Sequence, residues 1–167
     1  DGLNKYLSKA HSPVKNLDEI IKYNKEHAPK AMPYFKQELL EESASKGDLQ
    51  STVYVESLSK ILEVTKTAID DCMKQYQLDA ILSPGDGPSW CTDLVNGDAF
   101  FGNSYYWPAA ICGYPHITVP MGFTHGLPVG LCFIGEKWSE GTLIGFAYAY
   151  EQVSKSRRAP KFLNKIG

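Results

Sequence analysis

Three Ser-x-x-Lys spacings are the first groups in this sequence whose types and separation could support hydrolysis. They are Ser12 with Lys15, Ser43 with Lys46, and Ser57 with Lys60. On a helix this spacing places a hydroxyl and an amine on one face, as in serine-lysine hydrolases. Pro13 interrupts the first pair, the companion S-D-N and K-T-G elements are missing, and lysines on polar surfaces stay protonated. We therefore interpret all three pairs as surface residues.

Thiol chemistry is a second possibility, with Cys91 or Cys112 as the nucleophile and His116 or His125 as its base. Single histidines that flank strands more often have satisfied structural hydrogen bonds, and that interpretation is favoured here. The four cysteines lie about twenty residues apart without a Cys-x-x-Cys pair; they are Cys72, Cys91, Cys112 and Cys132. We predict buried free thiols in a reducing compartment rather than metal ligands or disulfides.

Aromatic residues gather between Gly85 and Pro115, a stretch too long for an ordinary connection. They are Trp90, Phe100, Phe101, Tyr105, Tyr106 and Trp107. Flat amphipathic rings suit an apolar substrate pocket, and they also anchor loops against a core. The polar residues among them either orient a substrate amide or form turns; they are Asp86, Asp93, Asp98 and Asn103. The sequence leaves both alternatives open.

Helices and short strands must position this stretch. Capping and periodicity predict a helix from Asn16 that Pro29 ends, one from Pro33 through Ser45, one from Thr52 to Gln75, and a last one over about 139–156. Short apolar runs predict buried strands at 80–82, 117–119 and 129–134. Buried strands need helices over their faces, so the pattern favours an α/β layered domain.

Composition narrows the class of function. The chain has 167 residues, of which 43% are hydrophobic and 22% charged, and its net charge is -2. These values indicate one compact domain and disfavour a nucleic-acid binder or a polybasic membrane segment. No apolar run approaches the roughly 18 residues that a membrane span needs. Because the chain begins at Asp1, we expect it to be an excised or processed part of a longer protein.

Two adjoining motifs carry a resemblance to a known family. The first is G-Y-P-H-I-T-V-P-M-G-F over 113–123, and the second is G-L-P-V-G-L-C-F-I-G over 126–135. Together with Leu78-Asp79-Ala80-Ile81-Leu82-Ser83-Pro84 upstream, and Trp138-Ser139-Glu140 leading into the last helix, they resemble the closing segment of amidase-signature enzymes. The likeness covers nearly the whole chain, with Cys112 as a departure where the family often has alanine.

The resemblance implies an α/β/α fold around a mixed sheet, and carboxamide hydrolysis by a serine activated through a second, cis-linked serine and a lysine. In the family these three residues belong to an N-terminal part, whose Gly/Ser-rich signature has no match in this sequence. Asn103 matches a place where amidotransferase relatives carry an aspartate that contacts the substrate. The change to asparagine removes a charge and weakens the expectation of a substrate with an α-amino group.

We therefore expect residues 1–167 to be the C-terminal portion of an amidase domain, with a helical segment over 14–76 and a strand-containing segment over 79–135. We predict no catalytic residue, metal ligand or cofactor in it, and we name Trp90, Asp93 and Asn103 as candidate substrate-binding residues. The expected partners are an amide substrate and the N-terminal catalytic part, not nucleic acid or membrane, in the cytoplasm. An exposed strand edge predicts self-association. The alternative is a free-standing binding or scaffold domain derived from this fold.

Overall fold

The computed structural model describes residues 1–100 and 104–162. The chain divides into two compact units, one made of Asp1–Leu58 with Asp93–Gly97 and the other of Ser59–Thr92 with Asp98–Gly167. Each unit has its own set of internal contacts.

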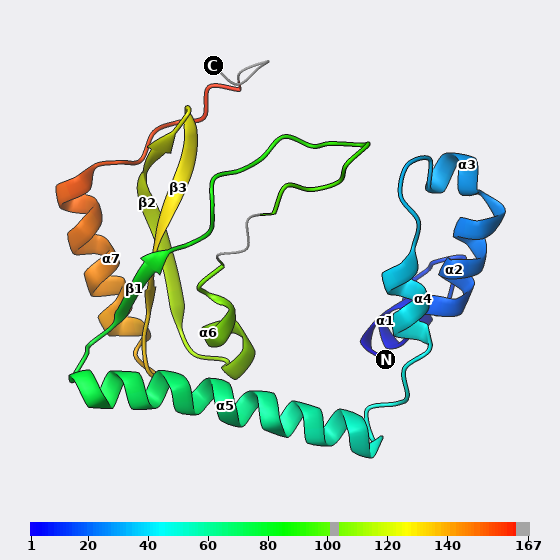
Figure 1. Cartoon of the computed structure of the whole chain (residues 1–167), viewed down its shortest axis with the longest axis horizontal. Helices are drawn as coiled ribbons and strands as arrows, with labels where there is room; N and C mark the ends of the chain where they lie inside the picture. The colour runs from blue at the N-terminus through cyan, green and yellow to red at the C-terminus, as the bar shows by residue number, and fades with distance from the viewer. Residues whose placement is uncertain (101–103, 163–167) are drawn as a thin grey trace. The chain divides into compact units, whose positions relative to one another are not determined.

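The first unit is helical, as Figure 1 shows in blue and cyan. It contains α1 (Gly2–Lys9), α2 (Leu17–Glu26), α3 (Ala28–Ala31), α4 (Glu38–Ala44) and the beginning of α5 (Thr52–Tyr76). Neither α1 nor α3 was predicted from the sequence. Helix α1 has Asp1 at its N-cap, but the Asp1 side chain makes no capping hydrogen bond.

Helix α2 begins as its capping residues predict. The Asn16 side chain accepts a 2.9 Å hydrogen bond from the Glu19 amide, and a Glu19 carboxylate oxygen accepts one from the Lys15 amide at 2.7 Å. The prediction for the other end is wrong. The helix stops at Glu26, and Pro29 lies in the first turn of α3, where its missing N–H costs nothing.

The buried side chain of Gln37 joins α2 to the segment before α4. Its amide nitrogen donates to the Ile21 carbonyl at 3.0 Å, and its oxygen accepts from Asn24 at 2.9 Å. These tertiary contacts hold Gln37 outside helical geometry, and α4 starts after it at Glu38. The predicted helix from Pro33 is therefore too long at its N-terminal end.

Helix α5 matches its prediction almost to the residue. Its apolar stripe, however, is buried only near the C-terminal end, at Ile69 and Met73. Nearer the start, Leu58, Ile61 and Leu62 are 40%, 46% and 37% exposed in this chain. The expected core-facing role is thus confirmed for the last turns alone.

The second unit is built on a three-stranded sheet of β1 (Ile81–Pro84), β2 (His116–Thr124) and β3 (Leu127–Ile134). The strand order is β1-β3-β2, and both pairings are antiparallel. All three predicted strands are present, and each extends beyond the apolar run that indicated it. In the described part of the chain, β1 and β2 each have one edge without a neighbouring strand.

A two-residue turn joins β2 to β3. His125 and Gly126 both have positive φ, 48° and 77°, as a type I′ hairpin turn requires. Thr124 pairs directly with Leu127 on either side of it. The register shifts between Pro120 and Gly122, which marks a bulge in the outer strand.

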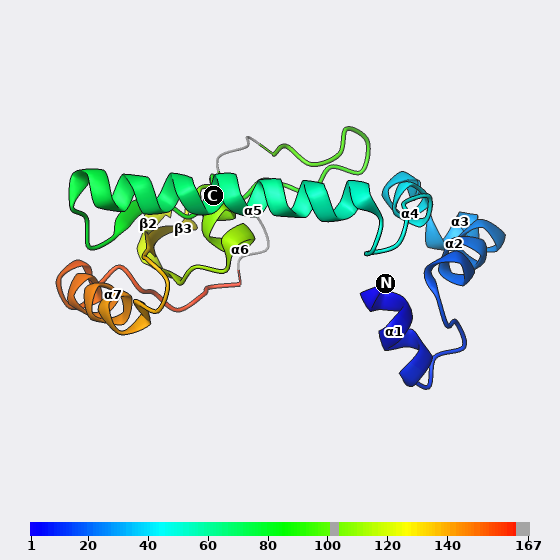
Figure 2. The same ribbon diagram turned by 90° about the horizontal axis from the view of Figure 1, so that it is seen from below.

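Helices cover both faces of this sheet. On one face, the last turns of α5 and helix α6 (Trp107–Cys112) bury Ile69, Met73, Ala109, Tyr114 and Ile134 together. On the other, α7 (Glu140–Ser154) packs Leu143 and Ala147 against Val119 and Phe133. Figure 2 shows the sheet between α5 and α7. This layering confirms the α/β class, and the last helix ends close to its predicted boundary.

Candidate functional site

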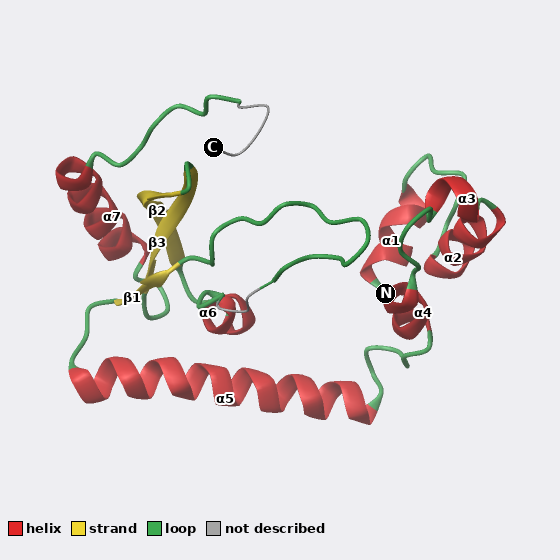
Figure 3. Cartoon of the chain, turned by 45° about the horizontal axis from the view of Figure 1, so that its top comes forward, coloured by secondary structure: helices red, strands yellow, loops and turns green. Residues whose placement is uncertain are grey.

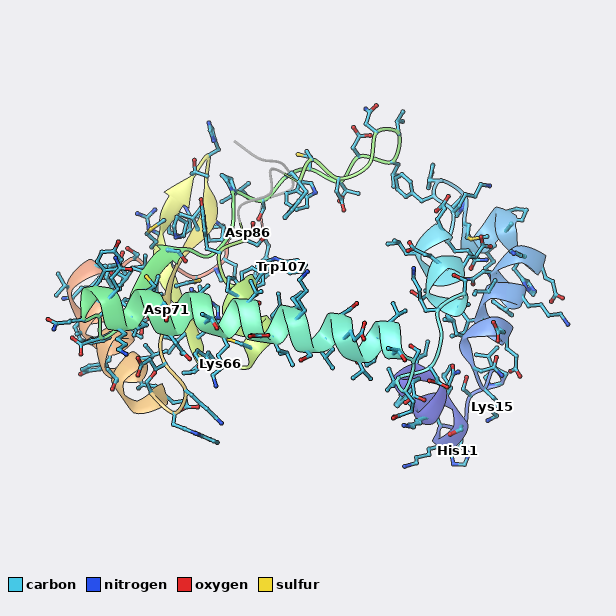
Figure 4. The ribbon with its side chains drawn as sticks, turned by 60° about the horizontal axis from the view of Figure 1, so that its bottom comes forward. His11, Lys15, Lys66, Asp71, Asp86 and Trp107 are labelled. Carbon is cyan, nitrogen blue, oxygen red and sulfur yellow. The ribbon has the colours of Figure 1, made fainter. Side chains whose placement is uncertain are left out.

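The connection from β1 to α6 carries most of the polar and aromatic residues singled out from the sequence. Its described part contains no helix or strand (Figure 3). Figure 4 labels Asp86, just after β1, and Trp107, the first residue of α6, which bracket it. The Gly85 amide donates to the Gly130 carbonyl at 2.9 Å and extends the β1–β3 ladder by one residue. The connection thus starts from a fixed point on the sheet.

Trp90 is half-buried and held by two neighbours from the same connection. Its Nε1 donates to an Asp98 carboxylate oxygen at 3.1 Å, and its ring meets Phe100 edge-on at a centroid distance of 5.7 Å. Such an aromatic pair adds to the stability that burial alone gives. Both contacts come from the connection itself, and they orient the indole.

The Asp93 carboxylate forms a turn. One oxygen accepts from the amides of Val95 and Asn96 at 2.8 and 2.9 Å, and the other accepts from the Asn96 side chain at 2.9 Å. The backbone amide of Asn96, followed by its side chain and the Val95 amide, holds the pKa of Asp93 below its usual value. Turn formation, one of the two alternatives kept open, accounts for all of these contacts. Asn103 lies outside the described residues.

A row of two hydroxyls and one thiol crosses the sheet on the α6 side. Ser83 and Thr118 both pair with Cys132, from β1 and β2 respectively. The Thr118 hydroxyl lies 3.1 Å from the Cys132 sulfur, and it also lies 3.4 Å from Nε2 of His116. The Ser83 oxygen is buried without a hydrogen-bond partner among the described residues. Neither Ser83 nor Thr118 was singled out from the sequence.

Two glycines allow this row to pack closely. A methyl group at Gly85 would lie 3.0 Å from the Cys132 sulfur, and one at Gly130 would lie 2.6 Å from the Thr118 methyl. Carbon atoms in contact prefer about 3.5–4.0 Å. Close approach between strands, rather than positive φ, therefore favours glycine at both positions, and a side chain at Gly130 would force a neighbour to move.

The four cysteines differ in their exposure to solvent. All four are free, as predicted, but only Cys132 is buried, and Cys91 is exposed. The prediction of burial is wrong for Cys91, because its connection leaves it uncovered. The Cys112 thiol contacts the Ala109 carbonyl at 3.8 Å, and His116 contacts the Thr118 hydroxyl. Among the described residues, no hydrogen bond therefore joins Cys112 to His116. Burial lowers the pKa of His116 and favours the neutral ring.

Tyr114, at the turn between α6 and β2, links that turn to α5. Its hydroxyl donates a 2.6 Å hydrogen bond to the Asp70 carboxylate. Burial, with a further contribution from Asp70, raises the pKa of Tyr114 to about 12. Gly113 has a φ of 73°, and the Tyr114 amide bonds to the Ala109 carbonyl at 2.9 Å, which closes helix α6. The base of the connection is thereby fixed on the same core as the sheet.

The family model for amidases matches residues 2–144. The chain belongs to the amidase family. This match includes β1, β2 and β3 and the whole β1–α6 connection. Within the described residues, no helix is long and apolar enough to cross a membrane.

Three amidase-family relatives show how much of the family's length is present. A probable amidase of Arabidopsis thaliana is 33% identical over 96% of this chain and 28% of its own length. The native peptide amidase of Stenotrophomonas maltophilia is 39% identical, with a TM-score of 0.85 over 96% of this chain and 32% of its own. A glutamyl-tRNA(Gln) amidotransferase component of Clostridium botulinum is 34% identical over 61% of this chain and 21% of its own. The chain therefore spans about a third of its relatives or less.

Proposed function

We propose that this chain is the C-terminal portion of an amidase that hydrolyses carboxamides, and that it supplies sheet, helical cover and part of the substrate-pocket wall. The observation that carries the proposal is the match to the peptide amidase over 96% of this chain with a TM-score of 0.85. A segment that keeps this fold at 39% identity is expected to have the same structural role in the domain.

The catalytic group is expected outside this chain. Acyl transfer needs an activated nucleophile, a base within reach and donors for the oxyanion. The Ser-cisSer-Lys set implied by the family resemblance has no counterpart in the sequence motifs of this segment. The three Ser-x-x-Lys spacings do not replace it, since among the hydrogen bonds of the described residues none joins the serine to the lysine of a pair.

Trp90, Asp93 and Asn103 remain our candidates for the pocket wall. Trp90 supports this role best, because its ring is held in place before any substrate binds, which lowers the cost of ordering it. Asp93 is expected to act by shaping its own turn. Asn103 is proposed from its place in the motif alone.

The substrate class follows from the relatives' names. Peptide amides stand first on the panel we propose, because the solved relative at 39% identity is a peptide amidase. A role within an amidotransferase is less supported, since the match to the amidotransferase component covers 61% of this chain against 96% for the amidases. The free thiols fit a reducing compartment, and we propose the cytoplasm.

The test is ammonia release from a panel of short amides. It compares this chain alone with a chimera in which it replaces the matched third of the Stenotrophomonas maltophilia peptide amidase. We expect activity in the chimera and none in the isolated chain. Activity of the isolated chain would show that the catalytic residues lie within it, and a folded but inactive chimera would favour the scaffold alternative. The unmodified peptide amidase is the positive control.

A further inference from the structure

The segment that follows α7 runs past the hairpin end of β2. Helix α7 ends at Ser154, where the Lys155 amide bonds to the Glu151 carbonyl at 3.1 Å and Lys155 takes a left-handed φ of 46°. A residue other than glycine keeps this backbone conformation only where neighbouring contacts hold it there. Figure 1 shows the segment, in red, crossing from α7 to the hairpin. We call residues 155–158 the C-terminal strap.

Two side-chain contacts fasten the C-terminal strap to β2. The Ser156 hydroxyl donates a 3.1 Å hydrogen bond to the Met121 carbonyl, 35 positions earlier in the chain. The Arg158 guanidinium lies 4.7 Å from the centre of the Phe123 ring, within the range of a cation–π contact. Met121 and Phe123 both belong to β2, so the strap joins the end of the last helix to an outer strand of the sheet.

Met121 is the residue of β2 that needs such a partner. The register of β2 with β3 passes over it, since Pro120 pairs with Gly130 and Gly122 pairs with Val129. The extra residue of a bulge is left out of the strand ladder, and a backbone carbonyl away from water needs a donor from elsewhere. The Ser156 hydroxyl supplies that donor. The bulge and the strap are therefore complementary.

The strap covers the part of the β2 edge that Pro120 does not protect. A proline and a bulge disfavour pairing where they occur, in the middle of the strand. Beyond them, Thr124 and Leu127 flank the two-residue turn and direct their backbone groups toward each other. Because these directions alternate along a strand, the backbone groups of Phe123 face away from β3. Without the strap, this end would present an outward N–H beside an aromatic ring, and copies of a protein can pair through such an edge.

We propose that the C-terminal strap guards this edge: it occupies the hairpin end of β2 and keeps a second copy of the chain from pairing with that strand. An exposed strand edge predicts self-association, and at β2 the chain opposes that association with its own segment. The Ser156 and Arg158 contacts carry the proposal. It makes no use of the amidase function, so neither proposal depends on the other.

The first test compares the full chain with a chain that ends at Ser154, by sedimentation equilibrium. We expect the association constant of the shortened chain to be at least about 10-fold higher. The shortening removes five basic residues and no acidic one, so the measurement is made in about 0.3 M salt, where repulsion between copies is largely screened. An unchanged association constant, in a shortened chain that keeps the circular dichroism spectrum of the full chain, would overturn the proposal.

Point substitutions decide the question if the shortened chain does not fold. Ser156→Ala combined with Arg158→Ala removes both contacts and keeps the segment, and we expect the association constant to rise about threefold or more. Lys161→Ala is the matched control, because it removes a positive charge just beyond the strap, and it should leave the constant unchanged. An equal rise in the control would mean that charge, not contact with β2, governs association, and the proposal would be wrong.

Hydrogen exchange at single amides shows which strand pairs. In the shortened chain, the Phe123 amide should exchange at least about 10-fold more slowly at a concentration where copies associate than at one where they do not. Leu82 is the reference on the other outer strand. The Gly85 amide bonds to Gly130, so Leu82, three residues earlier, directs its N–H away from β3. Association that protects Leu82 and leaves Phe123 unchanged would show pairing through β1 and would overturn the proposal.

Discussion

Tyr114 donates a 2.6 Å hydrogen bond to Asp70, and the two residues lie 44 positions apart in the sequence. This bond holds the turn between α6 and β2 against α5. After the long connection and α6, the chain re-enters the sheet at this turn. Among the described residues, it is the one side-chain hydrogen bond that joins α5 to a residue distant in the sequence.

Replacement of Tyr114 by phenylalanine tests this bond. We expect a loss of about 1–2 kcal/mol of unfolding free energy at neutral pH, since a hydrogen bond to a charged acceptor is lost and Asp70 keeps access to water. The pH dependence is a second readout. The folded-state pKa of about 12 lies above the ordinary 10.0, so the unfolded chain loses this proton first, and stability falls as pH rises from about 10 through about 12. The difference between wild type and variant should shrink over that range; a constant difference would contradict the assigned pKa.

Gly130→Ala is expected to destabilise the second unit by about 1–3 kcal/mol, because the new methyl group would lie 2.6 Å from the Thr118 methyl. Gly122→Ala is the matched control, since a methyl group there meets nothing within 4 Å. Thr118→Ser in the Gly130→Ala background removes the clashing methyl and should restore part of the loss. Urea denaturation of the four proteins measures these differences, and equal midpoints for the two alanine variants would rule out the clash.

Asp93→Ala should open the turn that its carboxylate forms. The amides of Val95 and Asn96 lose their acceptor, and we expect their hydrogen exchange to speed up about tenfold or more. The lowered pKa of Asp93 predicts the same opening on acidification: protection is present above the ordinary pKa near 3.8 and is lost as pH falls through the folded-state value. Protection of these amides, relative to their intrinsic exchange rate at each pH, that stays constant between about pH 5 and about pH 2 would show that the carboxylate is not what closes the turn.

Trp90 is the residue whose substitution should affect substrate binding in the chimera. Trp90→Phe keeps the ring against Phe100 and loses only the bond to Asp98, so we expect KM to change by less than about threefold. Trp90→Ala removes the ring, and we expect KM to rise about tenfold with a smaller change in kcat. If Trp90→Ala leaves KM unchanged while the protein stays folded, the ring anchors the connection and does not line the pocket.

Thiol labelling should follow exposure. Cys91 is expected to react with iodoacetamide first and Cys132 last, with Cys72 and Cys112 between them. Mass spectrometry of timed samples gives the order. The chimera labelled only at Cys91 should keep its amidase activity, and loss of activity would show that Cys91 lies at the substrate pocket or takes part in the reaction.

Local signals predicted much of this fold. Asn16 and Glu19 lie within one turn and indicated the start of α2, and the spacing of apolar residues predicted α5 and α7 nearly complete. Apolar runs with glycine and proline between them predicted the three strands. Pro29 led to a wrong boundary because a proline ends one helix and begins the next with equal ease.

Contacts between distant residues could not be predicted in the same way. Nothing near Gln37 indicates that its side chain reaches the Ile21 carbonyl, and that contact shortens α4. Ser83, Thr118 and Cys132 come together only through strand register. In the connection, Trp90 could be chosen as a site candidate because it is aromatic. Nothing in the sequence distinguished Asp98 from the other acidic residues nearby, and only the structure shows that it accepts the hydrogen bond of the indole.

The two pairings of β3 also differ in how they can form. The hairpin with β2 closes through the two residues His125 and Gly126, so it can assemble within about microseconds. Pro84, by contrast, pairs with Leu131, 47 positions further along the chain. Closing a loop of that size costs chain entropy before the strand contacts can stabilise it. We therefore expect β1 to join a preformed hairpin late in folding, and to be the first strand to leave it when the protein unfolds.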